Sequence, residues 1–489
     1  MSEKIEEFKR PSLLLALIPL AVLIVLLVLN VVYFGDAVLD GPNQVALLLA
    51  AAVCGTIGYF LKVPLEYMLK RINKTIYASL TAVLILLLIG CLSASWLVGG
   101  VIPAMIYYGI DIMHPSYFLV ASTVLCSLVS ISTGSSWSTV ATVGVAIIGI
   151  GHAFGMNEAV VAGAIISGAY FGDKMSPMSD TTNLAAVVAG TDLFTHIRYM
   201  VYTTGPTFII SLLIYTGIGL FMDGGNSMAE THVIKGVIEE SFVVSPILLL
   251  VPFALVVIIA LKVPAVPAML LGSGLGVICA LVFQQDLMNG MIAEGLFENK
   301  YHLLVQALGG GIDIPTQSEA IGDLLSSGGM SGMLATVWLI LSAMTFGGMM
   351  EACGTLKRIT DAILSIVYNT TSLIGSTILS CIVFNLITSD QYLSIVVPGK
   401  MMADSYRKRG LKPEVLSRAL EDSATVTSPL IPWNTCGATQ ARVLGVSTWA
   451  YAPYAFFCII SPLMNLLITF LNFKIRRLSS QEIENDSEE

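Results

Sequence analysis

Long apolar runs recur along this sequence from Ser12 almost to Phe473. A helix needs roughly 20 apolar residues to cross the hydrocarbon layer of a bilayer, which is about 30 Å thick. Only 12% of the 489 residues are charged, whereas a soluble domain carries about 25%. We therefore predict an all-α polytopic membrane protein in which residues 12–473 form the transmembrane domain.

The distribution of Lys and Arg predicts which loops face the cytoplasm. Basic residues cluster within residues 4–10, 62–74, 357–358, 407–412 and 474–477. Because cytoplasmic loops of membrane proteins are enriched in Lys and Arg, we expect all these clusters inside a bacterial cell, with the protein in the inner membrane. The N-terminal segment 1–11 and the acidic tail 474–489 would then both be cytoplasmic. The acid-rich stretches 222–241 and 285–332 are expected outside.

About ten full spans and two re-entrant hairpins satisfy this charge distribution. Single helices are expected over residues 12–34, 43–61, 76–98, 199–221, 243–262, 264–284, 333–352 and 450–473. Two further spans, 159–190 and 414–447, contain polar and Pro-rich interruptions, which predict broken helices. Residues 116–150 and 370–404 are too long for one crossing. If both segments are re-entrant hairpins, every basic cluster lies on the same side of the membrane.

The same order of elements occurs twice along the chain. A constant offset matches Cys126 with Cys381, Thr133 with Thr388, Trp137 with Tyr392 and Gly144 with Gly399. Each hairpin is followed by a Ser-Pro pair within a polar break, at Ser176-Pro177 and Ser428-Pro429. The first hairpin should enter from outside and the second from inside, so residues 76–221 and 333–473 would form inverted repeats. Secondary transporters commonly have this architecture, with the ion site near the middle of the membrane.

The first break contains two carboxylates, Asp173 and Asp180, on either side of Pro177. An ionised carboxylate in the middle of a membrane helix costs roughly 2.5 to 3.5 kcal/mol, so such a residue normally faces a polar cavity and has a function there. Three neighbours, Ser176, Thr181 and Asn183, add oxygen atoms of the kind that bind Na⁺. We expect Asp173, Asp180 and Asn183 to hold Na⁺. An exposed ion pair with Lys174 is the alternative for Asp173.

Protons and Na⁺ can compete for one carboxylate, because protonation removes the charge that attracts the cation. One site of this kind is enough for exchange. The hairpin tips and the second break supply further candidate ligands: Thr133, Ser135, Thr388, Asp390, Asp422, Thr427 and Asn434. We expect Asp390 and Asn434 to belong to a second polar cluster that faces the first. Glu421 and Asp422 follow Arg418 by one helical turn, so an ion pair with Arg418 is an alternative for them.

The stretch Ser167–Asn183 reads SGAYFGDKMSPMSDTTN. Together with Thr133-Gly-Ser-Ser-Trp-Ser138, it resembles the signature of the NhaC-type Na⁺/H⁺ antiporters. The likeness covers essentially the whole chain apart from its termini. It implies the fold of ion transporters with paired hairpins, and exchange of Na⁺, or Li⁺, for H⁺ by alternating access. The family also includes exchangers that couple Na⁺ to malate and lactate, and helix N-termini at the breaks can bind a carboxylate.

Two other classes of protein fit less well. Gly329-Met-Ser-Gly332 matches the GxSG of membrane serine proteases, but no histidine follows Ser331 to serve as the base, and no HExxH motif is present. A channel usually repeats one filter in each subunit, whereas this chain repeats its own halves. We expect no cofactor and no nucleic acid. The expected partners are membrane lipid, the transported Na⁺ and H⁺, a small mono- or dicarboxylate, and a second copy in a homodimer.

Overall fold

The structure is a computed structural model that describes residues 11–221, 227–316, 322 and 325–478. Nearly all of these residues are helical, and the sheet found among them has two short antiparallel strands, β1 (Ile312–Asp313) and β2 (Ser326–Ser327). Nine described helices are long and apolar enough to cross a membrane, or eleven if each of two bent pairs counts as one span. The predicted all-α polytopic membrane fold is confirmed.

One group of long helices includes α3 (Leu65–Val98). Its other members are α1 (Leu13–Phe34), α2 (Pro42–Phe60), α13 (Ala265–Phe283) and α17 (Leu334–Ala352). The helix α3 has 34 residues, so at 1.5 Å per residue it is about 51 Å long. It therefore starts eleven residues before the predicted span 76–98 and extends beyond the thickness of the hydrocarbon layer.

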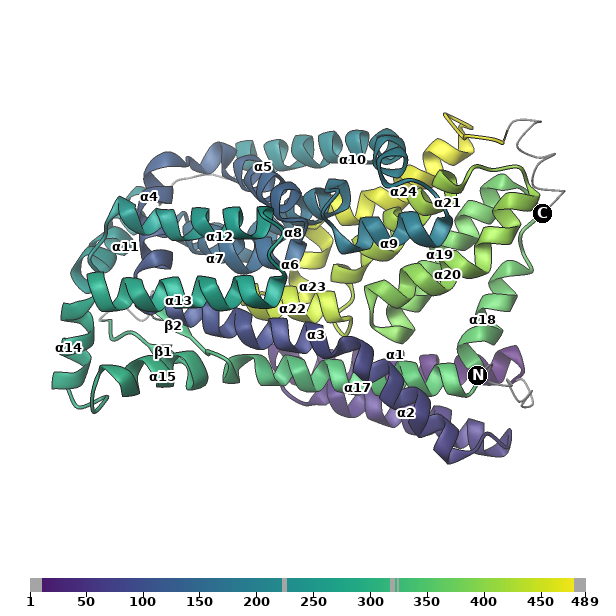
Figure 1. Ribbon diagram of the computed structural model, residues 1–489, viewed down its shortest axis with the longest axis horizontal. Coiled ribbons are helices and arrows are strands. Elements are labelled where there is room, and N and C mark those ends of the chain that lie inside the picture. The colour runs from purple at the N-terminus through teal and green to yellow at the C-terminus, as the bar shows by residue number, and fades with distance from the viewer. Residues whose placement is uncertain (1–10, 222–226, 317–321, 323–324, 479–489) are drawn as a thin grey trace.

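Both predicted hairpins are present, and Figure 1 shows them opening toward opposite ends of the molecule. The first consists of α5 (Pro115–Thr133), α6 (Ser136–Thr139), the π-helical turn η2 (Val140–Gly144) and α7 (Val145–Ala153). The second consists of α19 (Thr370–Thr388) and α20 (Gln391–Lys408). Each turns back through one residue in the left-handed conformation, Gly134 with φ 68° and Ser389 with φ 56°.

Each hairpin is followed by a broken helix. The first has the parts α8 (Glu158–Met175) and α9 (Asp180–Ala189), and the second has α21 (Pro413–Leu420), η6 (Glu421–Thr425), η7 (Ser428–Leu430) and α22 (Thr435–Leu444). The arm α5 packs along α8, and α20 packs against α21 and η6. We propose that these two units are the predicted inverted repeats.

Single helices follow each broken helix, and shorter helices complete the chain. The long ones are α10 (Leu193–Phe221) and α24 (Phe456–Phe470), the latter preceded by α23 (Thr448–Tyr451) and η8 (Ala452–Tyr454). The remaining elements are η1 (Gly35–Leu39), α4 (Val101–Ile112), α11 (Ser227–Ser241), η3 (Pro246–Leu249), α12 (Leu250–Ala260), α14 (Gln285–Ala293), α15 (Lys300–Gly310), η5 (Ser331–Met333) and α18 (Thr355–Leu364). Of this last set, η3 and α12 lie in a predicted span, 243–262.

We name the two ends of the molecule after α18 and α14, which lie at the right and left of Figure 1. The α2–α3 turn, α18, the α20–α21 turn and the segment after α24 all lie at the α18 end. There Arg71 pairs with Glu351 at 3.3 Å, and Leu411 bridges to Arg477. The described basic clusters therefore share one end, as the positive-inside pattern requires. That this end faces the cytoplasm remains a prediction.

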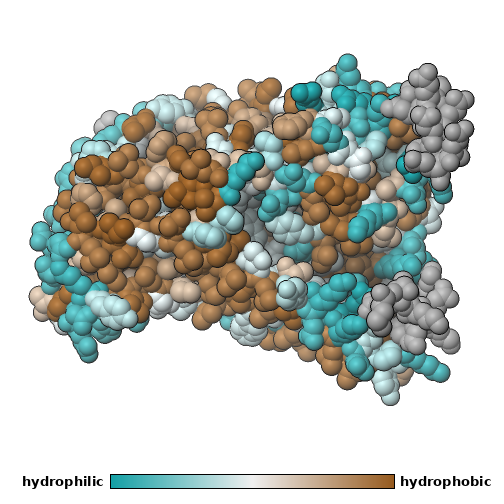
Figure 2. All heavy atoms as spheres, viewed as in Figure 1, coloured by the Kyte–Doolittle hydropathy of each residue, from teal (hydrophilic) through white to brown (hydrophobic). Residues whose placement is uncertain are grey.

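Hydrophobic side chains cover the flank of the molecule between its two ends. Figure 2 shows them over α12 and α13, with hydrophilic residues gathered toward the ends. Large apolar side chains such as Phe253, Leu270 and Ile278 are more than half exposed. A soluble protein rarely exposes so large an apolar area, so this surface fits contact with lipid.

Candidate functional site

A cavity of about 890 Å³ lies where the tips of both hairpins meet the first broken helix. Its wall also includes residues 78–85 of α3 and the turn between α12 and α13. Figure 2 shows a hollow near the middle of the face that is turned toward the viewer. Seven of the predicted site residues line the cavity: Thr133, Ser135, Asp173, Asp180, Thr181, Asn183 and Asp390.

The first break follows from a few residues between α8 and α9. Ser176 is extended, with ψ 129°, and Pro177 has no N–H to continue the helix. The hydroxyl of Ser179 then accepts the N–H of Thr182 at 3.5 Å and caps α9. Gly134 at the first hairpin tip lies so close that a Cβ atom there would be 2.7 Å from the carbonyl carbon of Met178. Only glycine therefore lets the tip touch the break.

Asp173 lies at the end of α8 and is only 5% exposed. Its Oδ2 accepts the backbone N–H of Ser136 at 3.1 Å and the hydroxyl of Ser136 at 2.6 Å. Its Oδ1 accepts the hydroxyl of Ser179 at 2.6 Å. Hydrogen bonds to an ionised group are stronger than neutral ones. These three donors fix both carboxylate oxygens beside the cavity and join the break to the hairpin tip.

Asp180 begins α9 and is exposed to the cavity. Among the described residues, no hydrogen bond to its carboxylate is found. Asn183 is held by its amide nitrogen, which donates to the carbonyls of Pro177 at 3.0 Å and Ser179 at 2.7 Å. The hydroxyl of Thr181 lies 3.0 Å from that of Ser179. Asp180 is thus the carboxylate at this break whose oxygens are left for a ligand.

The second hairpin tip adds a third carboxylate from the other side. Asp390 is 9% exposed and caps α20, since its Oδ1 accepts the N–H of Leu393 at 2.8 Å. It lines the same cavity as Asp173 and Asp180. Acidic groups from both halves of the chain therefore meet in one space.

Five predicted site residues do not line this cavity: Ser176, Thr388, Asp422, Thr427 and Asn434. Most of them hold the tips and breaks in place. Ser176 donates to the Ile131 carbonyl at 2.7 Å, and Thr388 donates to the Phe384 carbonyl at 2.9 Å. Asn385 donates to Thr427 at 3.0 Å and accepts from Asn434 at 3.2 Å. Asn434 is thus behind the second hairpin tip rather than at the cavity with Asp390.

Asp422 makes a buried ion pair with Lys174, and both side chains are fully buried. Asp422 also accepts hydrogen bonds from Thr203 at 3.2 Å, Ser461 at 3.0 Å and Asn465 at 2.8 Å. Two alternatives considered from the sequence are therefore wrong. Lys174 does not form an exposed pair with Asp173, and Asp422 pairs with Lys174 rather than with Arg418. The pair instead connects the two broken helices.

Several lining residues were not predicted as site residues. They include Ser79, Thr81 and Ala82 of α3, Lys262 in the α12–α13 turn, and Gln391, Tyr392 and Thr435 beside the second tip. The last three belong to polar segments that the sequence had marked. The others come from ordinary apolar spans, and no local pattern shows that these spans pass the hairpin tips.

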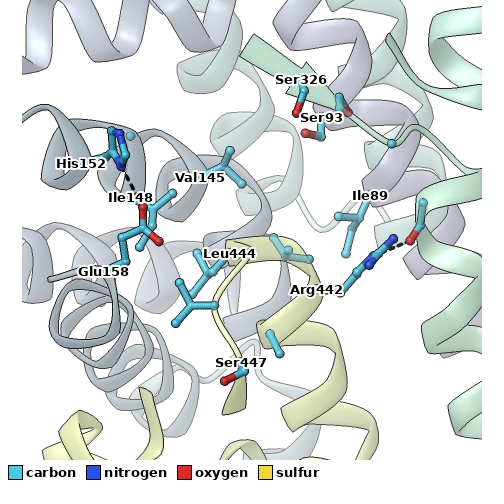
Figure 3. A pocket seen from close by; sticks show the side chains of 18 of the residues that line it. Ile89, Ser93, Val145, Ile148, His152, Glu158, Ser326, Arg442, Leu444 and Ser447 are labelled. Carbon is cyan, nitrogen blue, oxygen red and sulfur yellow. Dashed lines mark hydrogen bonds and ion pairs between the residues drawn. The ribbon is translucent and has the colours of Figure 1, made fainter. Parts of the chain in front are cut away.

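A second cavity, of about 910 Å³, lies closer to the α14 end. Figure 3 shows its side chains, with His152 paired to Glu158 on one side and Arg442 on the other. The His152–Glu158 distance is 2.8 Å. Arg442 donates to the carbonyl of Gly332 and lies 4.0 Å from Asp40. These contacts join the end of α22 to the chain around η5 and η1.

Carboxylates, hydroxyls and amides in the wall of the central cavity offer oxygen ligands. Among the described residues, no three His, Cys, Asp or Glu side chains are grouped to hold a metal ion. Hard oxygen donors beside broken helices are the ligands with which transporters bind Na⁺. Three acidic groups around one space can attract a cation and can also take up protons.

Comparison with known proteins places this arrangement in a family. The sequence model of the Na⁺/H⁺ antiporter family matches residues 168–473, which include both breaks and the second hairpin. The chain belongs to the Na⁺/H⁺ antiporter family. Membership confirms the resemblance seen in Ser167–Asn183 and establishes the protein as a membrane transporter of an antiporter type.

Named relatives in and around the Na⁺/H⁺ antiporter family differ in the substrates their names give. The Na⁺/H⁺ antiporter NhaC of Alkalihalophilus pseudofirmus is 34% identical over 90% of this chain and 91% of its own. The malate-2H⁺/Na⁺-lactate antiporter of Bacillus subtilis is 35% identical over 92% of each chain. The arginine/ornithine antiporter ArcD of Halobacterium salinarum is 34% identical over 99% of this chain and 97% of its own.

Proposed function

We propose that the protein exchanges Na⁺ for H⁺ across the bacterial inner membrane, with Asp173 and Asp180 as the carboxylates that bind the cation. The observation that carries this proposal is the single cavity in which both carboxylates meet hydroxyl and amide oxygens from the break and from the hairpin tip. Family membership supports the same reading. Li⁺ is the expected second cation because it is also a hard monovalent ion.

Exchange follows from competition for the acidic groups. A cation between Asp173 and Asp180 is attracted by both charges, and it loses that attraction when protons neutralise them. Ser136 and Ser179 hold the Asp173 carboxylate in a fixed position, so this half of the site needs little rearrangement to bind the cation. The site therefore holds either the cation or protons, as an antiporter requires.

Three segments extend from the central cavity to the second cavity and line both of them. On α3 the central cavity touches residues 78–85 and the second cavity touches Ile89, Ser93 and Leu97. The first hairpin lines the central cavity at its tip and the second cavity along α7, and α22 lines the central cavity at its start and the second cavity at its end. The fully buried residues Leu86, Val140 and Cys436 lie between these stretches. We propose that they form the barrier that opens when access alternates.

Purified protein in liposomes that contain a pH-sensitive dye tests the function directly. We expect Na⁺ or Li⁺ added on one side to move protons to that side, whereas K⁺ should give no signal. No proton movement with any cation, in protein that is folded and correctly inserted, would contradict the proposal.

A carboxylate or amino-acid substrate is a second candidate, favoured by the size of the central cavity. A volume of about 890 Å³ is in the range of sites for small organic ligands, which is about 300 to 1,000 Å³, and is far larger than a bare ion needs. Lys262 lines the cavity and offers a positive charge to a carboxylate. Malate, lactate, arginine and ornithine, each added with Na⁺ in the same liposomes, separate this function from simple cation exchange.

A further inference from the structure

A carboxyl group without a partner is buried behind the central cavity. Glu421 is the first residue of the π-helical turn η6 and is fully buried. Neither of its carboxyl oxygens has a hydrogen-bond partner among the described residues. A buried ionised carboxylate is costly unless it is paired. Its position therefore suits a group that alternates between a proton-bearing and an ionised form.

Neither of the two nearby basic residues pairs with Glu421 in the described part of the chain, although Nε and Nη1 of Arg418 have no hydrogen-bond partner there. Lys174 pairs with Asp422. Arg418 lies one helical turn before Glu421, but its guanidinium carbon stacks 4.4 Å from the ring centre of Tyr199 and its Nη2 reaches Asn465 at 3.4 Å. The alternative that Glu421 pairs with Arg418 is therefore wrong, and no ion pair to Glu421 occurs in the described part of the chain.

A row of hydroxyl groups leads from the cavity wall toward Glu421. Asp173 accepts from Ser179 at 2.6 Å, and the hydroxyl of Ser179 lies 3.0 Å from that of Thr181. Thr181 lines the cavity and its side chain lies near Glu421. Thr425 also lies near Glu421, and its hydroxyl has no hydrogen-bond partner among the described residues. A proton on Glu421 is therefore close to the cavity, although Glu421 itself does not line it.

The helices packed against η6 bring several charged or titratable groups toward Glu421. From α8 these are Asp173 and Lys174, from α9 Asp180, from α19 Cys381, from α20 Asp390, from α21 Arg418, and from η6 itself Asp422. The other charged residues of α20, which are Lys400, Asp404, Arg407 and Lys408, are exposed. The helix α24 adds the neutral side chains of Ser461 and Asn465 around Asp422.

We propose that Glu421 carries a further exchanged proton, in addition to those that compete with the cation at Asp173 and Asp180. This inference rests on the proposed Na⁺/H⁺ exchange. When a cation arrives beside Asp173, its positive charge favours the ionised form of Glu421. The O–H bond of Glu421 then breaks, and the proton leaves by way of Thr181 to water in the cavity. When the cation leaves, Glu421 takes a proton back.

Proton release on Na⁺ binding tests this assignment in the purified full-length protein. With a pH dye and weak buffer in detergent, addition of Na⁺ to the unaltered protein should release protons, while radioactive Na⁺ reports binding. Glu421→Gln keeps the neutral shape, so it should still bind Na⁺ but release fewer protons for each Na⁺ bound. Glu414→Gln is the matched control, because Glu414 is also buried but pairs with Arg476 at 3.1 Å, and it should release protons like the unaltered protein.

The outcomes separate this inference from the proposed function. If the unaltered protein neither binds Na⁺ nor releases protons, Na⁺/H⁺ exchange itself is wrong. If it does both, and Glu421→Gln releases as many protons per Na⁺ bound, another group carries the proton and our assignment is overturned. Should Glu421→Gln not fold, infrared difference spectra of the unaltered protein decide. Na⁺ should remove the band of a protonated buried carboxyl, and no such loss would overturn the assignment.

Discussion

The two broken helices have similar sequences but present their acidic groups in opposite ways. At the first break, Asp173 and Asp180 line the central cavity. At the second, Glu421 and Asp422 are fully buried and do not line it. The acidic groups of the first break are therefore accessible to a ligand, whereas those of the second break are buried inside the protein.

The position of each acidic group relative to its proline explains the difference. Asp173 precedes Pro177 by four residues and Asp180 follows it by three, so both lie next to the interrupted backbone. Asp422 precedes Pro429 by seven residues, which is about two helical turns. It therefore lies on the side of a still-continuous helix that packs against α8 and α24. Similar composition thus gives a binding surface in one half and a buried ion pair in the other.

The largest effect should come from removing one partner of the buried pair. Lys174→Ala leaves Asp422 buried without its cation, and a lost partner of this kind destabilises a protein by about 3 to 5 kcal/mol. We expect a large drop in the thermal unfolding temperature in detergent. Lys262→Ala, at the rim of the cavity, is the control and should unfold near the temperature of the unaltered protein. Equal unfolding temperatures of the two variants would show that the acidic group at the second break does not depend on a buried ion pair.

Asp173→Asn should abolish exchange and leave the fold intact. A neutral amide is easier to bury than a carboxylate, but it removes one of the two charges that attract the cation. Na⁺-driven proton movement in liposomes should be lost, while the unfolding temperature stays close to that of the unaltered protein. Exchange at the normal rate would show that the first break is not the cation site.

Ser136→Ala should weaken cation binding without abolishing it. Two of the three hydrogen bonds to Asp173 come from Ser136, and this substitution removes the one made by the hydroxyl. A hydrogen bond to a charged group contributes about 1.5 to 3 kcal/mol, so the Kd for Na⁺ should rise about tenfold or more. Ser132→Ala, on the same hairpin but with a hydroxyl that donates to the Leu128 carbonyl, should leave the Kd unchanged in the same titration.

The smallest effect is expected at Asp192, an exposed carboxylate before α10. The N–H of Thr195 donates to it at 3.0 Å and lowers its pKa below the ordinary value of 3.8. Because the pKa is lower in the folded protein, this contribution is fully present above pH 3.8 and is lost as the pH falls through the lowered pKa. Asp192→Asn should therefore narrow the difference in unfolding temperature between pH 5 and pH 3 slightly. If the difference in unfolding temperature between pH 5 and pH 3 is unchanged, the hydrogen bond from Thr195 to Asp192 does not contribute to stability.

The sequence predicted the elements of this fold better than the contacts between them. Long apolar runs, basic clusters and paired Ser-Pro breaks were enough to predict an all-α membrane fold, both hairpins and the carboxylates Asp173, Asp180 and Asp390, which line the cavity. These patterns did not show which way Lys174 and Asp422 point, because packing between segments far apart in the chain decides which side of a helix faces which neighbour. The adjacency of Asp173 and Lys174 suggested a pair that the helix geometry prevents, since neighbouring residues on a helix point in different directions.

The central claim is that a cation and protons compete at the first break, and Asp180→Asn tests it most directly. Asp180 faces the cavity without a hydrogen bond from the described residues, so the substitution changes its charge and little else. Na⁺-driven proton movement should be compared in liposomes of equal protein content with Asp192→Asn as the control. We predict that exchange is lost in Asp180→Asn and retained in Asp192→Asn. Full exchange by folded Asp180→Asn protein would contradict the account.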